Sequence, residues 1–259
     1  MTPCNKNERR IYGRVWGEVH GGYFSDAKVA RPLVRELCAA AIAARPDAVA
    51  DLGGGTGFIL GLLAGRHAFL RARLLDVDSS GTQLRACPHS RVCHTNRPIQ
   101  LVSRRELLPE GSGTLLLTMR SVLHYFGAKN RQQSLLRRLR ALSQPGEYFV
   151  HQTACYSDGR DAALMNDIYR RMRTEKRYFT GAQVIDMLAR AGWRVEKIVP
   201  AKQIILHSDE LAHRYRLSGK TVREITSAIT RSRACSAVSL SESSFVGFLE
   251  YSVFVCRAA

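Results

Sequence analysis

The stretch Val49-Ala-Asp-Leu-Gly-Gly-Gly-Thr-Gly57, followed by the apolar run Phe58-Ile-Leu-Gly-Leu-Leu63, decides the fold of this chain. The pattern predicts a short buried strand, a sharp glycine turn and the first turn of a helix. That geometry allows a ligand to approach the backbone N–H groups at the helix N-terminus. We therefore expect a ligand site at this strand–helix junction.

The glycine spacing separates two classes of cofactor. A dinucleotide fingerprint requires the pattern G-x-G-x-x-G. Counted from Gly53 the third glycine would fall at Phe58, and counted from Gly55 it would fall at Leu60, so both registers fail. The segment instead matches acidic-x-G-x-G-x-G, whose fixed positions here are Asp51, Gly53, Gly55 and Gly57.

This pattern resembles the first motif of the class I S-adenosylmethionine-dependent methyltransferases, whose ligand is a zwitterionic amino acid joined to a nucleoside. The resemblance implies S-adenosylmethionine as the cofactor, bound through the acid and the three glycines. It also implies an α/β, Rossmann-like fold in which a seven-stranded, mostly parallel sheet carries helices on both faces.

The rest of the chain alternates between strand and helix patterns, as a doubly wound sheet requires. We predict strands at 48–53, 71–78, 99–102, 114–123, 147–153, 194–206 and 245–256. We predict helices at 26–44 with Ser25 as N-cap, 57–65, a short one opened by Ser79 and Ser80, and others at 130–143, 161–176, 181–190 and 208–232. This order is that of the class I methyltransferase fold.

Two regions are additional to that core, within one compact unit. Residues 1–46 form an N-terminal leader ahead of the cofactor-binding domain at 47–259, and an insertion covers about 207–243. Helical additions at these places are expected to form a lid over the substrate pocket. The alternative is that they only cover an edge strand.

The second predicted strand ends in two acids, Asp76 and Asp78. An acid at the end of this strand can accept hydrogen bonds from both ribose hydroxyls of a nucleoside. The family pattern here resembles acid-x-Ser-x-x-x-Leu, which Asp78 matches through Leu84, so we favour Asp78 and keep Asp76 second. An acid that caps the following helix would occupy the same position.

The adenine contact is a departure from the family pattern. In many relatives an acid just after strand three, ahead of a Leu-Pro pair, contacts the adenine amino group. Here arginines at 104 and 105 and then Glu106 precede Leu108-Pro109. Either Glu106 or a backbone group is expected to replace the usual acid.

The fourth and fifth strands supply the candidate reaction residues, because ligands of an open α/β sheet lie beyond the carboxyl ends of its strands. Arg120 is a candidate cofactor contact there, and His124 is either a general base or a wall of the cofactor pocket. His151, at the predicted end of strand five, is expected near the reacting carbon. The segment that follows offers Asn166, Tyr169, Arg170, Arg173, Lys176, Arg177 and Tyr178, either to an acidic substrate or to solvent.

The leader carries the aromatic segment Trp16-Gly-Glu-Val-His20-Gly-Gly-Tyr23-Phe24. It resembles the entrance segment Trp-Gly-x-His-x-Gly-Tyr-Tyr of small-molecule methyltransferases, where an aromatic ring lies near the sulfonium. Tyr12, Tyr23 and Phe24 are the candidates, and we take Tyr23 as the catalytic one. The alternative is that these rings only pack the leader against the core.

The composition excludes several other classes of protein. No run of 18 apolar residues occurs, so no membrane span is expected and the protein should be cytoplasmic. The net charge of +17 reflects 32 arginines and 7 lysines spread along the chain, a distribution that does not favour a nucleic-acid partner. The seven scattered cysteines indicate reduced thiols. We expect no metal site, and a loop rather than a ligand set at Cys87, His89, Cys93 and His94.

These observations predict an S-adenosylmethionine-dependent transferase that methylates a small-molecule metabolite or natural product. They leave a homodimer open. Methyl transfer requires alignment more than acid–base help. One alternative is attack on the aminocarboxypropyl arm, by alkyl transfer or cyclisation with release of methylthioadenosine. A second alternative is an RNA methyltransferase, although the Asn/Asp-Pro-Pro-Tyr sequence of such enzymes is missing after strand four. A non-catalytic cofactor-binding protein is a third.

Overall fold

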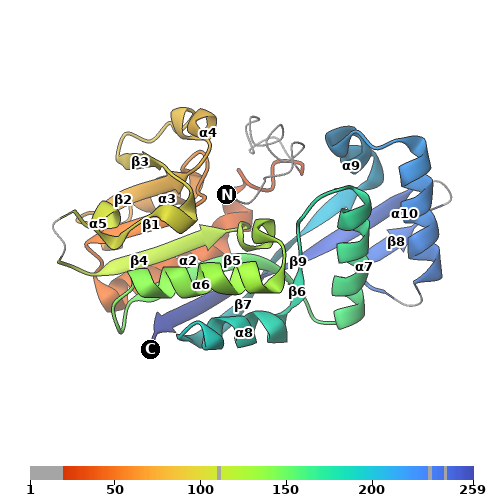
Figure 1. Ribbon diagram of the computed structural model, residues 1–259. Helices are drawn as coiled ribbons and strands as arrows, with labels where there is room; N and C mark the ends of the chain where they lie inside the picture. The colour runs from red at the N-terminus through yellow and green to blue at the C-terminus, as the bar shows by residue number, and fades with distance from the viewer. Residues whose placement is uncertain (1–19, 110–111, 233–234, 242–243) are drawn as a thin grey trace.

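A computed structural model describes residues 20–109, 112–232, 235–241 and 244–259 (Figure 1). Its central sheet has the strand order β3-β2-β1-β4-β5-β9-β7, and two short strands, β6 and β8, pair with β5 and β9. The strands are β1 (Ala48–Leu52), β2 (Arg73–Asp78), β3 (Val92–Asn96), β4 (Leu115–Arg120), β5 (Tyr148–Tyr156), β6 (Phe179–Thr180), β7 (Trp193–His207), β8 (Val238–Leu240) and β9 (Phe245–Ala258). Neighbouring strands from β3 to β5 are parallel, and β9 runs antiparallel to β5 and β7. The predicted α/β architecture with a seven-stranded, mostly parallel main sheet is confirmed, with two short strands in addition.

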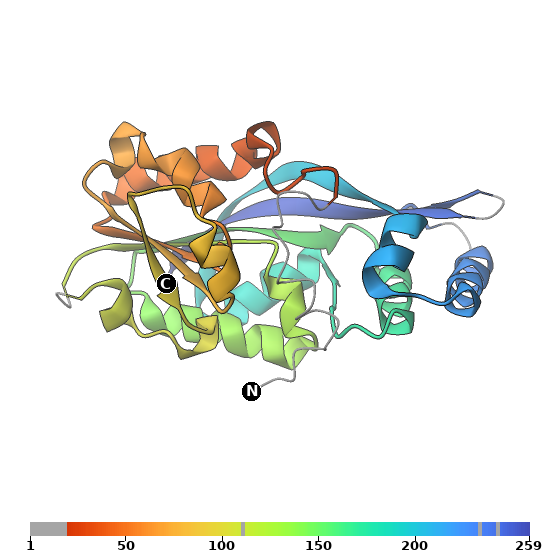
Figure 2. The same cartoon turned by 90° about the horizontal axis from the view of Figure 1, so that it is seen from above.

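Helices cover both faces of this sheet. The helices are α2 (Ala27–Ala44), α3 (Phe58–Ala64), α4 (Gly81–Arg85), α5 (Arg104–Leu107), α6 (Lys129–Leu142), α7 (Gly159–Arg171), α8 (Gly181–Arg190), α9 (Ser208–Tyr215) and α10 (Gly219–Arg231), with short 3₁₀ turns η2 (His67–Phe69), η3 (Ile99–Leu101) and η4 (Leu123–Phe126). Figure 2 shows the sheet edge-on, with α2 and α3 on one side and α6 and α8 on the other. Each side buries its own apolar cluster against the sheet.

A third apolar cluster lies at one end of the molecule. The long strands β7 and β9 continue past the rest of the sheet, and α7, α9 and α10 lie at that end (Figures 1 and 2). The buried side chains there include Tyr156, Tyr169, Tyr178, Tyr215 and Tyr251. The predicted insertion at 207–243 therefore shares an apolar cluster with β5, α7 and β9. Within the leader that was expected to form a lid, α2 packs on the sheet instead. The lid prediction therefore applies only to the segment that precedes α2.

One strand prediction was wrong. The third strand is not at 99–102, where Pro98 precedes the 3₁₀ turn η3, but at Val92–Asn96. Because β3 pairs only with β2 in the sheet path, most of its side chains are exposed, and hydrophobicity does not mark it. Cys93 and His94 consequently lie in a strand, although a loop was expected there.

Several element ends also differ from the sequence prediction. The N-cap of α2 is Asp26, which accepts a hydrogen bond from Lys28 N at 2.7 Å, whereas Ser25 bonds back to Gly22 O. The helix expected at 208–232 is two helices, because Arg216 adopts a left-handed conformation between them. The helix expected at 161–176 ends at Arg171. No helix among the described residues has the length and apolar character to cross a membrane.

Candidate functional site

The glycine turn between β1 and α3 has no room for side chains. Gly53, Gly55 and Gly57 have φ angles of +80°, +67° and +71°, a region that other residues rarely adopt. A Cβ at Gly55 would also collide with Gln83 Oε1. At Gly54 it would lie 2.6 Å from Asp76 Oδ1 and 2.7 Å from Asp51 Oδ2. The turn therefore passes directly over two carboxylates.

Asp51 and Asp76 are paired positions of the parallel strands β1 and β2, and both are almost fully buried. Burial raises the pKa of Asp51 to about 7, against the lowering effect of Arg120. Burial and the charges of Asp51 and Asp78 raise the pKa of Asp76 to about 9, although the amides of Gly54 and Gly57 lower it. Within the described part of the chain, neither oxygen of Asp51 accepts a hydrogen bond.

Asp78 is the last residue of β2 and supports the turn directly. Its Oδ2 accepts a hydrogen bond from Gly55 N at 3.1 Å, and its Oδ1 accepts one from Ser80 N at 2.7 Å. The N-cap of α4 is Ser80, whose hydroxyl accepts from Gln83 N. A carboxylate has about four lone pairs, so Asp78 can still accept a hydrogen bond from a ligand hydroxyl.

Arg120 ends β4 on the same sheet face as Asp51. Its guanidinium donates to Phe24 O at 3.0 Å and to Tyr23 O at 3.2 Å, and it lies 5.4–5.9 Å from the ring centroids of Phe24, Tyr23 and Phe58. Within the described residues its Nε has no hydrogen-bond partner.

Further unsatisfied polar atoms lie on the same sheet face, in two neighbouring lines of paired strand positions, and together with Asp51 and Arg120 they form a polar row. They are Thr118 Oγ1, next to Asp51 in the sheet, and Gln152 Oε1, next to Arg120. Buried polar atoms usually have partners, so this row is suited to a polar ligand. An ammonium group beside Asp51 and a carboxylate beside Arg120 would satisfy both charges, which makes the row suitable for a zwitterion.

The leader brings Tyr23 against this row. Its hydroxyl donates to Lys202 O and accepts from Gln152 Nε2 at 3.1 Å, and burial raises its pKa to about 12. Its ring packs edge-on against Phe24 with centroids 5.2 Å apart. Both candidate interpretations of Tyr23, sulfonium contact and packing, are compatible with this position. Tyr12 and Trp16 lie outside the described residues.

His124 lies in η4, directly after β4, and is 4% exposed. Its ring centroid is 4.4 Å from that of Tyr125 and 5.0 Å from that of Tyr178. Burial lowers its pKa well below the usual value, and the charges of Lys176 and Arg214 lower it further. The environment of His124 therefore does not produce a general base that titrates near neutral pH. The imidazole is neutral, and its Nδ1 has no partner among the described atoms.

The expected position of His151 at a strand end was wrong, because β5 continues to Tyr156. Its ring is stacked between Phe149 and Phe254, with centroids 4.5 and 5.3 Å away, and is fully buried. Burial lowers its pKa to about 3. A catalytic role for His151 stays a prediction.

A second polar group near His124 contains residues that the sequence did not single out. Lys176 Nζ donates to Tyr215 Oη at 2.8 Å and lies 4.5 Å from the Tyr125 ring centroid. Arg214 lies 2.6 Å from His20 Nε2. We call Lys176, Arg214, His20 and His124 the buried basic cluster. Lys176 was among the residues assigned to the substrate side and His20 stands in the aromatic leader segment, but no periodicity or motif marks Arg214 or Tyr215.

The two remaining candidate sites are the adenine contact at Glu106 and a metal site. Glu106 forms a capping box with Ser103 and an ion pair with Arg97 at 3.0 Å, so its carboxylate already serves helix α5. Among the described residues, no three His, Cys, Asp or Glu side chains are grouped to hold a metal.

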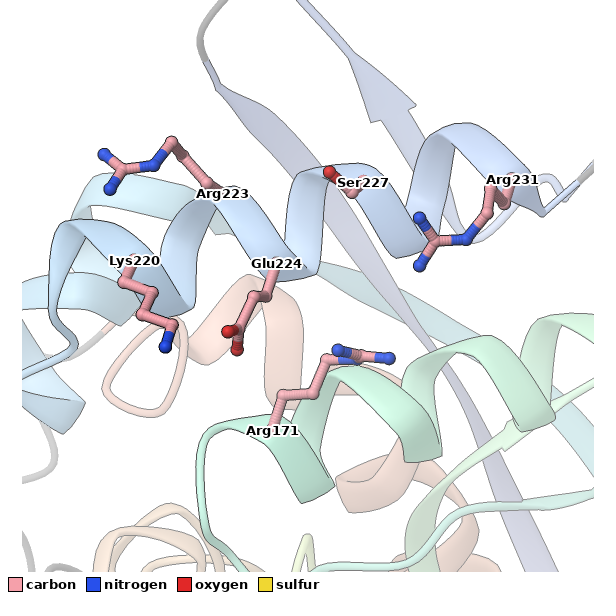
Figure 3. A pocket seen from close by; sticks show the side chains of 6 residues that line it. All are labelled: Arg171, Lys220, Arg223, Glu224, Ser227 and Arg231. Carbon is pink, nitrogen blue, oxygen red and sulfur yellow. The ribbon is translucent and has the colours of Figure 1, made fainter.

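A hollow of about 370 Å³ lies between α7 and α10, apart from the predicted site residues (Figure 3). Its lining residues are Arg171, Lys220, Arg223, Glu224, Ser227 and Arg231. Because most of these side chains are exposed, solvent and salt screen their charges. We therefore regard this hollow as a solvated basic surface.

The chain matches the family model described as "Methyltransferase domain" over residues 24–198. The match includes the glycine turn, the three aspartates and the segment from Arg120 to His151. It stops before α9 and α10. No curated protein matches the chain in a sequence comparison.

Solved structures share the fold at low sequence identity. A Bacillus halodurans C-125 protein described as a methyltransferase matches with a TM-score of 0.66 and 12% identity, covering 86% of this chain and 97% of that one. Human N-acetylserotonin methyltransferase, in complex with S-adenosylmethionine, matches with a TM-score of 0.51 and 14% identity, covering 96% and 61%. The [4+2]-cyclase SpnF matches with a TM-score of 0.54 and 10% identity, covering 88% and 80%.

Proposed function

Because this chain belongs to the methyltransferase domain family, whose enzymes use S-adenosylmethionine, we propose that it transfers the methyl group of this cofactor to a small molecule. The observation that carries the proposal is the row of buried, unsatisfied polar atoms beside the glycine turn. Such a row is costly to an empty protein, so a ligand of matching charge is expected there.

The two ends of the cofactor have separate candidate partners in this proposal. Asp51 receives the ammonium group and Arg120 the carboxylate of its amino-acid part. Asp78 accepts the ribose hydroxyls, and its hydrogen bond to Gly55 N holds the turn in place. The glycines leave the backbone open to the ligand. Asp76 is the second candidate for the ribose, but it is directed at Gly54 and fully buried.

The reacting centre is proposed to lie between Tyr23 and His124. When bound, the cofactor supplies an activated methyl group on a sulfonium. Tyr23 offers an aromatic face to that positive charge. His124 is neutral, so its Nδ1 can accept the proton or hydrogen bond of the substrate atom that is to be methylated. The main contribution of the protein is alignment of the two reactants.

One observation supports a second candidate function. A [4+2]-cyclase shares this fold, so the fold does not by itself determine the reaction. The second candidate function is attack on the cofactor's aminocarboxypropyl arm rather than on its methyl group. Methylation of RNA is a further possibility, supported only by the positive charge of the chain.

The nucleoside product distinguishes these functions. The purified protein is incubated with S-adenosylmethionine and fractions of a small-molecule extract, and the products are separated by chromatography with mass detection. We expect S-adenosylhomocysteine together with a methylated compound. Methylthioadenosine would instead show attack on the arm. Turnover only when RNA is added would overturn the small-molecule proposal.

The two additions are proposed to close the substrate side. The leader at 1–46 reaches the site through Tyr23 and His20, and the insertion at 207–243 reaches it through Arg214 and Tyr215. Residues 47–259, which include the insertion, are proposed to hold the cofactor in one compact unit. Whether the protein is a homodimer is a separate question, answered by its mass in solution.

A further inference from the structure

Ser121 is the first residue after β4 and has an unusual backbone conformation. Its φ angle is +61°, in the left-handed region that residues other than glycine seldom adopt. It stands between Arg120, the proposed partner of the cofactor's carboxylate, and the segment that leads to His124. A backbone conformation of this kind persists only where the surroundings hold it, and such conformations are concentrated at functional sites. The contacts of Ser121 therefore bear on the cofactor site.

Two hydrogen bonds hold Ser121. Its N–H donates to Gln152 O at 2.8 Å, which extends the pairing of β4 with β5 by one residue. Its hydroxyl shares a hydrogen bond with the hydroxyl of Tyr251, with 2.5 Å between the oxygens. Both side chains are buried. Removal of one hydroxyl would therefore leave the other without its partner in a place that water does not readily reach.

Tyr251 also supports the leader. Its ring packs against that of Tyr23, with centroids 5.8 Å apart. The backbone carbonyl of Tyr23 accepts a hydrogen bond from Arg120 Nη2 at 3.2 Å, and the guanidinium lies 5.5 Å from the Tyr23 ring. The hydroxyl of Tyr251 thus contacts the chain neighbour of Arg120, and its ring contacts the leader residue that binds the guanidinium. One side chain supports Arg120 from both sides.

The hydroxyl of Tyr251 carries no charge of its own. Burial and the neighbouring Tyr23 raise its pKa, whereas the hydrogen bond to Ser121 and the charge of Arg120 lower it, and the net shift is upward. Tyr251 therefore stays protonated at neutral pH. Its contribution to the site is one of position rather than of charge.

We infer that Tyr251 and Ser121 form a positioning pair, which holds the left-handed turn after β4 and thereby keeps Arg120 directed at the cofactor's carboxylate. This inference rests on the proposed function and adds two residues to its cofactor site. Tyr251 comes from β9, beyond residues 24–198 that the family model matches. Neither side chain is proposed to touch the ligand. Without the pair, Ser121 would relax to a negative φ and change the direction of the chain directly after Arg120.

The test separates the amino-acid end of the cofactor from its nucleoside end. S-adenosylhomocysteine has the carboxylate, whereas methylthioadenosine has the same nucleoside and a thioether but no amino acid. Both ligands are titrated calorimetrically into the wild type and into Tyr251→Phe, which keeps the ring that packs on Tyr23 and removes only the hydroxyl. We expect Tyr251→Phe to weaken S-adenosylhomocysteine on the order of tenfold and to leave methylthioadenosine unchanged.

Substitutions at Ser121 test the conformation itself. Ser121→Ala should weaken S-adenosylhomocysteine at least as much as Tyr251→Phe, because alanine lacks the hydroxyl and disfavours a positive φ. Ser121→Gly should recover part of this loss, because glycine adopts a positive φ without strain. For the same reason, the double variant Tyr251→Phe/Ser121→Gly should bind more tightly than Tyr251→Phe alone. Ser121→Ala also provides the second variant should Tyr251→Phe fail to fold.

Tyr156→Phe is the matched control. Tyr156 belongs to the same apolar cluster as Tyr251, is similarly buried, and donates from its hydroxyl to Phe248 O at 2.9 Å. This variant loses a buried hydrogen bond, which lowers the melting temperature, but both ligand affinities should stay unchanged.

Four results would each overturn the inference. They are full affinity of Tyr251→Phe for S-adenosylhomocysteine, an equal loss for both ligands in that variant, no gain of Ser121→Gly over Ser121→Ala, and the same selective loss in Tyr156→Phe. Binding of S-adenosylhomocysteine by the wild type reports on the proposed function. Its absence would refute that function and the inference with it, whereas binding without the selective loss refutes only the inference.

Discussion

The glycine turn and the buried basic cluster differ in the sign of the charges they contain: the turn lies over aspartates, and the cluster contains a lysine and an arginine. At the turn, Asp51, Asp76 and Asp78 come from two neighbouring strands, and one continuous stretch of sequence explains most of their placement. In the cluster, Lys176 and Arg214 come from distant segments, and both lie over the ring of Tyr215. The acids raise one another's pKa, and the cations lower the pKa of the histidines between them.

This difference teaches why one site is recognisable in a sequence and the other is not. A turn that binds a ligand through its backbone needs glycines at fixed spacing, so its chemistry is local. A substrate site is assembled from side chains of loops and additions, which differ from one enzyme to another on the same fold. The family match reflects the same difference, since the matched residues include the turn but end before α9.

The largest expected effect is at the glycine turn. Gly55→Val should abolish binding of S-adenosylmethionine, because the left-handed φ of +67° is strained for valine and its side chain would fill the space where a ligand approaches the backbone. Binding is measured by calorimetry, and circular dichroism checks the fold. Gly65→Val is the control, since nothing lies within 4 Å of a Cβ at Gly65. Unchanged affinity in Gly55→Val would remove the turn from the binding site.

The next effect concerns the cluster side of the comparison. His124→Gln should lower turnover by about 10²-fold, the low end of the range for a general base, because burial makes this imidazole a weak base. Cofactor affinity should stay nearly intact. Because the pKa of His124 is lowered well below 6.5, the pH–rate profile should show no acid limb from this residue between about pH 6 and 8.

His151→Gln is measured alongside, since both histidines were predicted near the reacting carbon. Should neither substitution change turnover, the site works by alignment alone and no acid–base residue is to be assigned.

At the turn, the ribose assignment is tested by comparing two neighbouring acids. Asp78→Asn should weaken the cofactor on the order of 10- to 100-fold, as expected for the loss of a charged hydrogen-bond acceptor. The asparagine side chain keeps the shape of the aspartate and an oxygen that can accept the hydrogen bond from Gly55 N. The matched variant is Asp76→Asn, which should have the smaller effect. The reverse order would show that Asp76 is the ribose acid.

The fold was largely predictable from the sequence, and the exceptions have physical causes. Apolar runs such as Leu115–Arg120 and the helix face of Leu135, Leu136 and Leu139 lie where the pattern placed them. Strand β3 was missed because an edge strand with exposed side chains lacks that pattern. The true end of β5 was missed because Ala154 and Tyr156 are buried in the apolar cluster at the end of the molecule whereas Cys155 is buried in the cluster of the α6 and α8 face, and no local signal separates the two environments.

The raised pKa values at the turn predict how stability depends on pH. Folded protein keeps protons on Asp51 up to about pH 7 and on Asp76 up to about pH 9, whereas the unfolded chain loses them near pH 4. The stability of the ligand-free protein should therefore fall as pH rises from about 4 to 9. Thermal unfolding should show a decrease of at least a few degrees, which Asp76→Asn should reduce. Asp186→Asn is the control, because its exposed carboxyl has a lowered pKa and no effect is expected above pH 5. A melting temperature that is constant over this range would argue against buried, protonated acids.

The smallest expected effect distinguishes a sulfonium contact from packing at Tyr23, the residue where the two regions meet. An aromatic face stabilises a cation by roughly 0.5–2 kcal/mol, so Tyr23→Leu should weaken S-adenosylmethionine roughly 2- to 30-fold more than the uncharged S-adenosylhomocysteine. Tyr23→Phe keeps the ring but loses the hydroxyl contacts with Lys202 O and Gln152, so it should weaken both ligands equally. Because Arg120 already lies 5.5 Å from this ring, the sulfonium must share the aromatic face with a resident cation, which favours the lower half of the range. Equal losses for both ligands in Tyr23→Leu would reduce Tyr23 to a residue that packs the leader against the sheet.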